Sequence, residues 1–350
     1  MDIVKNSSKY IMISLIAIVA SLGILLFGKL NLWIDMTGGI QMDYSYEKWV
    51  NIEEVNQLVS EASKEILHNE SQVINDTSVY KITGENALSA VVWFYDITEG
   101  ISNQEEIRET EKLLEWYKNE IRAKTLEILQ SQDETVLESK YQNIWKSFWD
   151  YIKNTAFLTL WIAILAIAIY VMHAFSGAVS GINVYSFALI TIATLFHDVI
   201  ISTGLYIFTS MFYSQFQIDT FFVTALLTIL GYSINDTIVV FDRIRDNLRK
   251  FAGKKDKNEK NLYEIVNMSI KETVVRSMYT SATLLFVLIT IFFFGPETIS
   301  GFVLVMIFGT IIGTYSSIFI ASPLFYMVNK NKKLSAYKKK VVNPEDKIVV

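Results

Sequence analysis

Six long apolar runs are the feature of this sequence that most restricts its fold. A helix of about twenty apolar residues crosses a bilayer core about 30 Å thick, and only helices and closed barrels satisfy every backbone hydrogen bond there. The 350-residue chain has a mean hydropathy of +0.32, which is unusual for a soluble protein. We therefore expect an α-helical integral membrane protein with six transmembrane helices, at residues 10–28, 155–173, 184–209, 220–241, 278–294 and 301–328.

The first run also begins like a secretory signal peptide, because Lys5 and Lys9 precede it. The segment that follows, LFGKLNLW, offers no cleavage site between small residues. This favours an uncleaved membrane helix over a cleaved leader, so residues 1–28 form the N-terminus and the first span.

A polar segment, residues 29–154, separates the first two spans, and its periodicity predicts a small α+β domain of the ferredoxin-like, βαβ type. Alternating apolar residues mark strands, and apolar residues on one helical face mark helices. The expected strands lie at 40–46, 78–83, 87–97 and 134–138, with a turn at Gly84-Glu85-Asn86, and the expected helices at 52–67 and 103–131. Residues 143–154 form an aromatic, amphipathic approach to the membrane interface, where Trp and Tyr rings are enriched.

The distribution of lysine and arginine predicts the orientation in the membrane. The N-terminus has 2 basic residues, the 243–277 loop has 10 and the tail 329–350 has 7, whereas the loops 210–219 and 295–300 have none. Short loops rich in basic residues stay in the cytoplasm. We therefore expect both termini and the 243–277 loop to be cytoplasmic, the five-helix bundle 155–328 to lie in the cytoplasmic (inner) membrane, and the 29–154 domain to be extracytoplasmic.

Charge and residue usage exclude several classes of function. The 29–154 domain has 12 basic and 23 acidic residues, which disfavours a nucleic-acid partner. The basic loop can meet anionic membrane lipid, although the positive-inside rule already explains its charge. The chain has no cysteine and only three scattered histidines, and it lacks nucleotide-binding and nucleophile-elbow motifs. We expect no metal, no cofactor and no enzyme; any work must draw on an ion gradient or a partner.

The stretch 219–250 places an acid, Asp236, inside an apolar run. A charge within a membrane helix costs at least about 2.5–3.5 kcal/mol on insertion scales, so it normally faces a polar partner, a cavity or an ion path. The alternative is that Asp236 reaches interfacial water, because it lies only six residues before Asp242.

Polar residues of the third, fourth and fifth spans recur at helical spacing, which puts them on one face of each helix. The three sets are Thr191, Thr194, Asp198 and Ser202; Thr224, Thr228, Tyr232, Asp236 and Arg243; and Arg276, Thr280, Thr283 and Thr290. Low dielectric favours the protonated carboxyl, and an approaching arginine favours the ionised one. Two acids and an arginine that meet inside a bundle predict a proton or ion relay of Asp236, Arg276 and Asp198; the alternative is a static Asp–Arg pair that fixes helix register.

The sixth span carries small residues at multiples of four, which let another helix approach closely. They are Gly301, Gly309, Gly313, Ser317 and Ala321. We interpret them as helix-packing positions. His197 precedes Asp198 and can tune it, or it is a packing residue at the membrane edge.

Five segments together resemble the SecF family, the membrane subunits of bacterial protein export, which are related to the resistance-nodulation-division transporters. The similarity covers nearly all of the membrane part and only the start of the domain after the first span. The segments are WIDMTGGIQMDY (33–44), HDVIISTG (197–204), GYSINDTIVVFDRIRDNLRK (231–250), VVRSMYTSATLL (274–285) and GTYSSIFIASPL (313–324).

The resemblance implies a partner, SecD, and use of the proton (or sodium) gradient to assist export of a polypeptide through the SecYEG channel with SecA. Asp236 and Arg276 fall on the proton-path positions of the family, and Asp198 on a recurring acid of the third span. The surrounding polar motif is Gly231, Tyr232, Asn235, Thr237, Asp242 and Arg243.

Two rival functions remain open at this point. One is a small-molecule exporter of the same superfamily, against which a single outside domain and six spans argue. The other is a non-transporting scaffold of the translocation machinery, in which Asp236 and Arg276 serve only as a register pair.

Overall fold

The computed structural model of the chain describes residues 2–28, 38–48, 50–68, 71–82, 86–95, 97, 101, 103–144, 146–175, 182–213, 216–252, 260–296, 299–332 and 334. It divides into two compact units, which we describe separately. The membrane unit comprises Met1–Asn31, Phe157–Phe216 and Phe221–Val350, and the α+β unit comprises Leu32–Ala156 and Gln217–Thr220.

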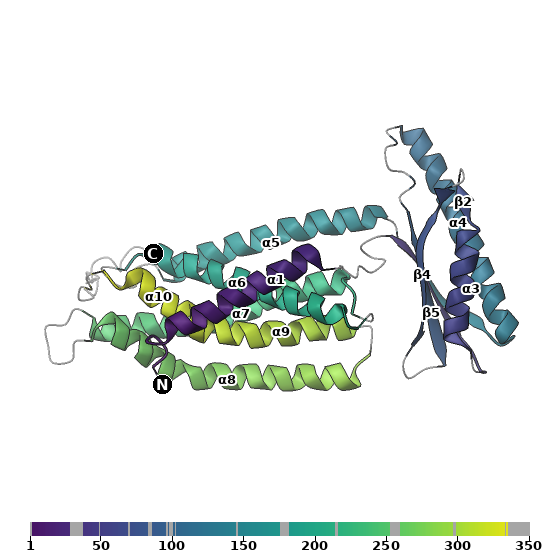
Figure 1. Cartoon of the computed structure of the whole chain (residues 1–350). Coiled ribbons are helices and arrows are strands. Elements are labelled where there is room, and N and C mark those ends of the chain that lie inside the picture. Colours follow the sequence, from purple (N-terminus) through teal and green to yellow (C-terminus); the bar gives the residue numbers. More distant parts are fainter. Residues whose placement is uncertain are drawn as a thin grey trace, which may run out of the picture. The chain divides into compact units, whose positions relative to one another are not determined.

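The membrane unit is a bundle of long helices (Figure 1). They are α1 (Ser7–Phe27), α5 (Lys146–Ala174), α6 (Val184–Ser210), α7 (Thr220–Phe251), α8 (Leu262–Phe294), and a last helix made of α9 (Ser300–Ser316), the π turn η2 (Ser317–Ala321) and α10 (Ser322–Asn329). Among the described residues, five helical stretches are long and apolar enough to cross a membrane. The second predicted span falls on α5, whose apolar part Leu158–Ala174 is shorter.

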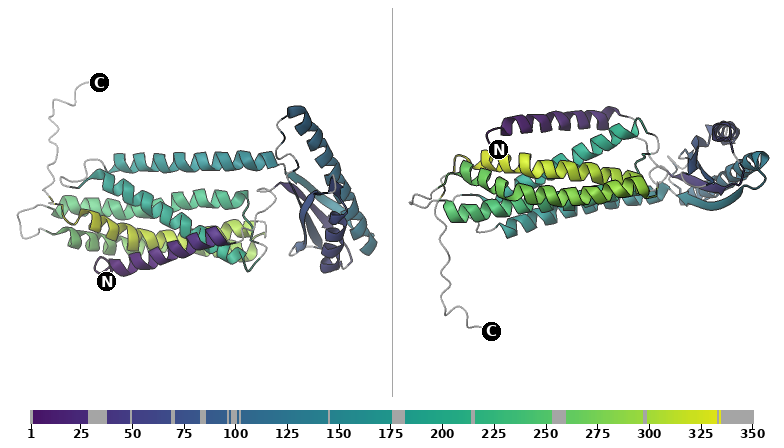
Figure 2. Two further views of the ribbon diagram at one scale, coloured as in Figure 1. Left: turned by 45° about the horizontal axis from the view of Figure 1, so that its top comes forward. Right: turned by 90° about the horizontal axis from the view of Figure 1, so that it is seen from below.

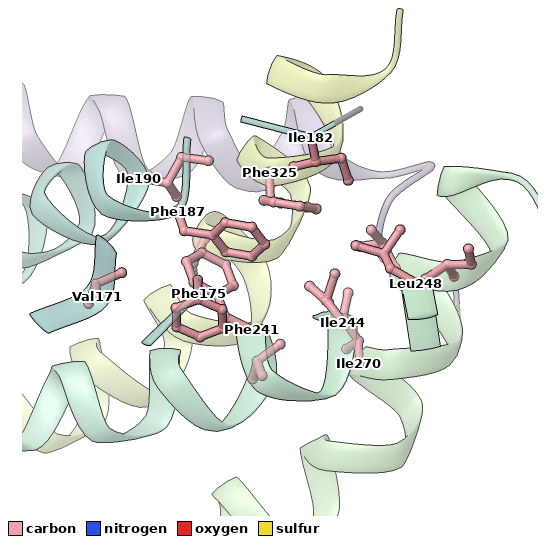
Figure 3. Packing of buried hydrophobic residues seen from close by; sticks show 14 of the residues in the cluster. Val171, Phe175, Ile182, Phe187, Ile190, Phe241, Ile244, Leu248, Ile270 and Phe325 are labelled. Atoms are coloured by element: carbon pink, nitrogen blue, oxygen red, sulfur yellow. The ribbon is translucent and has the colours of Figure 1, made fainter. Parts of the chain in front are cut away.

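Helices α7 and α8 extend well beyond the predicted spans, into the segment that the sequence suggested to be a loop. Ile244, Leu248 and Ile270 continue the helical spacing of apolar residues and are buried together (Figure 3). An Asn261 capping box with Glu264 fixes the start of α8. The 243–277 segment is therefore largely helical where it is described, because its apolar stripe outlasts the apolar run.

An aromatic cluster closes the same end of the bundle (Figure 3). Phe187 of α6 stacks on Phe175 with ring centroids 4.7 Å apart and packs against Phe325 at 4.6 Å and Phe241 at 5.3 Å. All four side chains are almost fully buried. This cluster joins α5, α6, α7 and α10 and holds the helices that carry the candidate site.

Helix α1 lies at the edge of the bundle, along α6 (Figure 2). Its buried residues are only Ser7, Ser14 and Ser21, which recur every seven positions. A Cβ on Gly204 of α6 would lie 2.3 Å from Cβ of Ser21, so a glycine is required there for contact. Small residues thus let the two backbones approach, as is usual for helix pairs in membranes.

The last helix contains a π turn at Ser317–Ala321. Pro323 follows it and has no backbone N–H for the carbonyl of Phe319, four residues earlier. The proline ring also clashes with that carbonyl in a regular α-helix, so the wider turn relieves the conflict. The hydroxyl of Ser322 donates to the Ser317 carbonyl at 3.2 Å.

The α+β unit contains an antiparallel sheet in the order β4-β5-β1-β6. Helices α3 and α4 cover one face of this sheet (Figure 1), and their apolar residues form one core with Ile40, Met42 and Leu88. Among the described residues the elements are β1 (Gly39–Ser45), α3 (Ile52–Lys64), β4 (Ile74–Ile82), β5 (Ala87–Phe94), α4 (Gln104–Gln132), β6 (Leu137–Ile144), and a small hairpin of β2 (Leu67–His68) and β3 (Ser71–Gln72).

The last strand differs from the prediction of a short strand at 134–138. It runs to Ile144, into the segment expected to approach the membrane, because its side chains are tied to α4. Arg122 donates to both carboxylate oxygens of Glu138 at 2.8 and 2.5 Å. Lys118 donates to Asn143 at 2.7 Å, and burial lowers the pKa of this lysine below its ordinary value.

Some predicted features lie outside the described residues. Among them are Thr83 and Asp96 at the ends of predicted strands, Gly84 and Glu85 of the predicted turn, residues 33–37 of the first family segment, Trp145 of the aromatic approach, residues 253–259 of the 243–277 segment, and residues 333 and 335–350 of the tail.

Candidate functional site

Three of the polar residues that the spacing places on one face of α7 do face α8, namely Tyr232, Asp236 and Arg243. The Tyr232 hydroxyl donates to Oγ of Ser281 at 2.8 Å. Eleven residues after Tyr232, Nε of Arg243 donates to Glu272 at 2.6 Å. Between them lies Asp236, on which Ser277 and Arg276 of α8 act electrostatically. This part of the predicted stripe therefore lies at the α7–α8 contact, whereas Thr224 and Thr228 are exposed.

Asp236 is the least satisfied acid of this surface. Its side chain is buried, with 4% exposure, and its Oδ2 has no hydrogen-bond partner among the described residues. The neighbouring Oγ of Ser277 is also buried without a partner there. Arg276 is exposed, and within the described chain no ion pair joins it to Asp236. A buried carboxyl with one unpaired oxygen is able to bind and release a proton.

Asp198 occupies a different contact, between α6, α7 and α9. It is fully buried. Its Oδ1 contacts Nδ1 of His197 at 2.7 Å, and its Oδ2 accepts hydrogen bonds from Ser233 of α7 and, at 2.8 Å, from Ser316 of α9. Asp198 thus joins three helices, and among the described residues no hydrogen bond or ion pair links it directly to Asp236 or Arg276.

The supporting motif of α7 divides between its buried and exposed faces. Thr237 is buried and donates to the Ser233 carbonyl at 3.2 Å, whereas Asp242 pairs with Arg245 on its own helix. Gly231 and Asn235 are exposed, and a Cβ on Gly231 would meet nothing within 4 Å. The exposed members of the motif leave a polar surface on the outside of α7.

The small residues of the last span allow α9 to approach α7. A Cβ on Gly309 would lie 2.3 Å from side-chain atoms of Ile229, and a Cβ on Gly313 would lie 3.2 Å from Cβ of Ser233. Ser317 is fully buried and begins the π turn. The close approach brings Ser316 within reach of Asp198.

The sequence did not reveal the hydroxyl partners of the site. Ser281 bridges Tyr232 of α7 to Thr314 of α9, whose Oγ1 is 2.5 Å away and donates in turn to the Thr310 carbonyl. Serine and threonine are common in membrane helices, so residue type alone does not identify which hydroxyls contact the site. Pro323 was a signal for the π turn beside this network. In the described part of the chain no group of acids and histidines has the arrangement of a metal site.

These features define a polytopic membrane protein with an α+β domain after its first helix and a buried acid at a helix–helix contact. Residues 124–331 match the family described as protein export membrane protein SecD/SecF, C-terminal. The SecF protein translocase subunit of Thermobaculum terrenum is 34% identical over 92% of this chain and 92% of its own length. That of Endomicrobium trichonymphae is 30% identical over 95% of this chain and 93% of its own length.

A solved structure shows the same fold. The crystal structure of SecDF from Thermus thermophilus, a translocon-associated membrane protein, matches with a TM-score of 0.66 and 23% identity. It covers 94% of this chain, and this chain spans 39% of that longer one. The chain belongs to the SecF family of protein translocase subunits, and this membership assigns it a SecF-like role in protein translocation.

Proposed function

We propose that this chain, together with SecD, uses the proton or sodium gradient to assist Sec-dependent translocation of polypeptides across the cytoplasmic membrane. One observation carries the proposal: α7 and α8 hold a buried acid beside polar residues that face out of the bundle. Asn235 and Arg276 are exposed on these two helices. Polar groups at membrane depth belong against a partner or a water-filled path.

Asp236 is the proposed proton carrier and Arg276 its counter-charge. In the structure Oδ2 of the carboxyl has no hydrogen-bond partner among the described residues, and the arginine is close enough to act on the carboxyl without an ion pair. Approach of the arginine favours release of the proton, and its withdrawal favours binding. Asp198 on α6 is the second acid of the proposed relay, and it joins α6 to α7 through Ser233 and to α9 through Ser316.

SecD is the proposed partner that covers the outer polar surface. This surface consists of Thr228, Gly231 and Asn235 on α7 and Arg276 and Thr280 on α8, all exposed in this chain. The matched chain is named SecDF, after both SecD and SecF, and this chain spans only 39% of its length. A second membrane half provides polar groups for these residues and completes the ion path.

The proposed topology has six transmembrane helices, with α5 as the second. Both termini and the 243–277 segment are cytoplasmic and the 29–154 domain is extracytoplasmic, since basic residues gather on one side. The β1-α3-β4-β5-α4-β6 order and the sheet order β4-β5-β1-β6 support a ferredoxin-like domain. That domain acts on the emerging polypeptide after SecYEG and SecA have moved the polypeptide across the membrane.

Export driven by an imposed gradient tests the proposal. Asp236→Asn in a reconstituted SecD–SecF complex with SecYEG and SecA keeps the shape of the side chain and removes its charge. We expect loss of the gradient-dependent part of export. Asp246→Asn removes the same charge near the end of α7 and is the matched control. We expect this variant to keep the gradient-dependent part of export.

The outcomes separate this function from its rivals. Unchanged gradient-dependent export with Asp236→Asn removes the relay. Retained export in the double swap Asp236→Arg with Arg276→Asp favours a scaffold, because the pair then needs only opposite charges. Altered drug efflux with normal secretion in a deletion strain favours a small-molecule exporter.

A further inference from the structure

His197 and Asp198 form a buried pair. The proposed relay gives a role to Asp198 and none to His197. Their side chains are 5% and 0% exposed. Nδ1 of His197 lies 2.7 Å from Oδ1 of Asp198, which is a short, direct hydrogen bond. The pair lies near the middle of α6 (Val184–Ser210), in a helix apolar enough to cross the membrane.

The hydrogen bonds at Asp198 suit a proton on Nδ1 of His197. Oδ2 accepts from the hydroxyls of Ser233 and Ser316. An ionised carboxylate has acceptor sites only, so Oδ1 of an ionised Asp198 is satisfied when Nδ1 of His197 donates to it. In this tautomer Nε2 of His197 is the nitrogen free to take a proton.

The other ring nitrogen of His197 has no fixed partner. Nε2 is buried and makes no hydrogen bond within the described residues. If Nε2 carries no proton, the pair has a net negative charge in the bundle, where a single charge costs at least about 2.5–3.5 kcal/mol. A proton bound at Nε2 makes the histidine an imidazolium, which compensates the carboxylate.

Among the described residues, no lysine or arginine makes an ion pair with Asp198. On α7, Tyr232 and Asp236 lie one residue before and three residues after Ser233, and on α9 Tyr315 lies next to Ser316. The Tyr315 hydroxyl donates to the Tyr10 carbonyl of α1 and accepts from Ser14. On the α1 side the buried residues are serines.

We propose that His197 and Asp198 form a second proton-binding site of the membrane unit, which takes up one proton at Nε2 of His197. The N–H bond forms at Nε2, Asp198 stays ionised and keeps its three donors, and the proton leaves from the same nitrogen. His197 is then a proton-carrying residue in addition to Asp236. This inference rests on the proposed coupling to a proton gradient.

Nitrogen NMR of the histidine ring tests the site directly. The full chain with SecD in lipid nanodiscs carries ¹⁵N-histidine, and His197→Asn identifies the signal among the three histidines. We expect Nε2 of His197 to gain one proton when the sample is acidified, and this protonation to change in Asp198→Asn. A single protonation state of Nε2 in neutral and acidified samples overturns the proposal.

Export assays separate proton binding from positioning. Asparagine places an N–H donor near the position of Nδ1, so His197→Asn keeps a donor to Asp198 but binds no proton, whereas His197→Leu removes both properties. We expect both variants to lower gradient-dependent export about tenfold or more, with SecD assembly unchanged for His197→Asn. Normal export with asparagine and loss with leucine overturns the proposal in favour of a positioning role.

Failure of this inference is distinguishable from failure of the proposed function. If Asp236→Asn keeps gradient-dependent export, the proposed function is wrong, whatever the NMR of His197 shows. If Asp236→Asn abolishes it while Nε2 of His197 never changes protonation, only the second site is wrong.

Discussion

Replacing Gly309 by alanine tests the close approach of α9 to α7, on which the position of Asp198 and Ser233 depends. The added Cβ would lie 2.3 Å from Cδ1 and Cγ1 of Ile229 and 2.8 Å from its Cγ2. Ile229 is fully buried, so the clash falls on a side chain inside the bundle. Overpacking of this kind costs about 1–3 kcal/mol. The folded-to-unfolded ratio then falls roughly 5- to 140-fold.

Gly23→Ala is the matched control, because a Cβ on Gly23 meets nothing within 4 Å. Both variants gain the same helix propensity of about 1 kcal/mol, so the difference between them isolates the contact. Equilibrium unfolding in bicelles measures that difference. Adding Ile229→Ala to Gly309→Ala relieves the clash, with a coupling of about 0.5 kcal/mol or more. Equal stability of Gly309→Ala and Gly23→Ala, or no coupling to Ile229, refutes the reasoning.

Two further substitutions address the α+β unit. Arg122→Leu breaks two hydrogen bonds to Glu138, and we expect about 1 kcal/mol less protection of β6 in hydrogen exchange of the full chain. Asp133→Asn tests acid stability, because hydrogen bonding from the Thr135 hydroxyl, aided by backbone N–H donors, lowers the pKa of Asp133 from 3.8 to about 2. The stabilisation is complete above about pH 4 and is lost as the pH falls toward 2. The substitution should flatten that part of the stability curve; an unchanged curve contradicts it.

Helical periodicity was enough to predict most helices of the membrane unit and the helix face on which Asp236 lies. Tyr232, Asp236 and Arg243 were expected on one face, and they face α8 because residues four and seven apart lie on one side of a helix. The small residues Gly309 and Gly313 were expected at a close contact, and they are at one. Local spacing decides such features.

Features that depend on distant partners were beyond this reasoning. Nothing in the local sequence of Ser233 or Ser316 identifies Asp198 as their acceptor, since the choice arises from how three helices pack. The length of β6 is set by its pairing with β1 and its contacts with α4, not by alternation of its own residues. The π turn was foreseeable from Pro323, whose missing N–H breaks the regular helix.

Proton flux through the purified SecD–SecF complex tests the central claim most directly. Liposomes with an internal pH-sensitive dye receive an inward proton gradient, and a parallel set receives a sodium gradient. We expect ion uptake by the unaltered complex, loss of this uptake in Asp236→Asn, and unchanged uptake in Asp246→Asn. Equal uptake by the complex with and without the Asp236 carboxylate, for both ions, would contradict it.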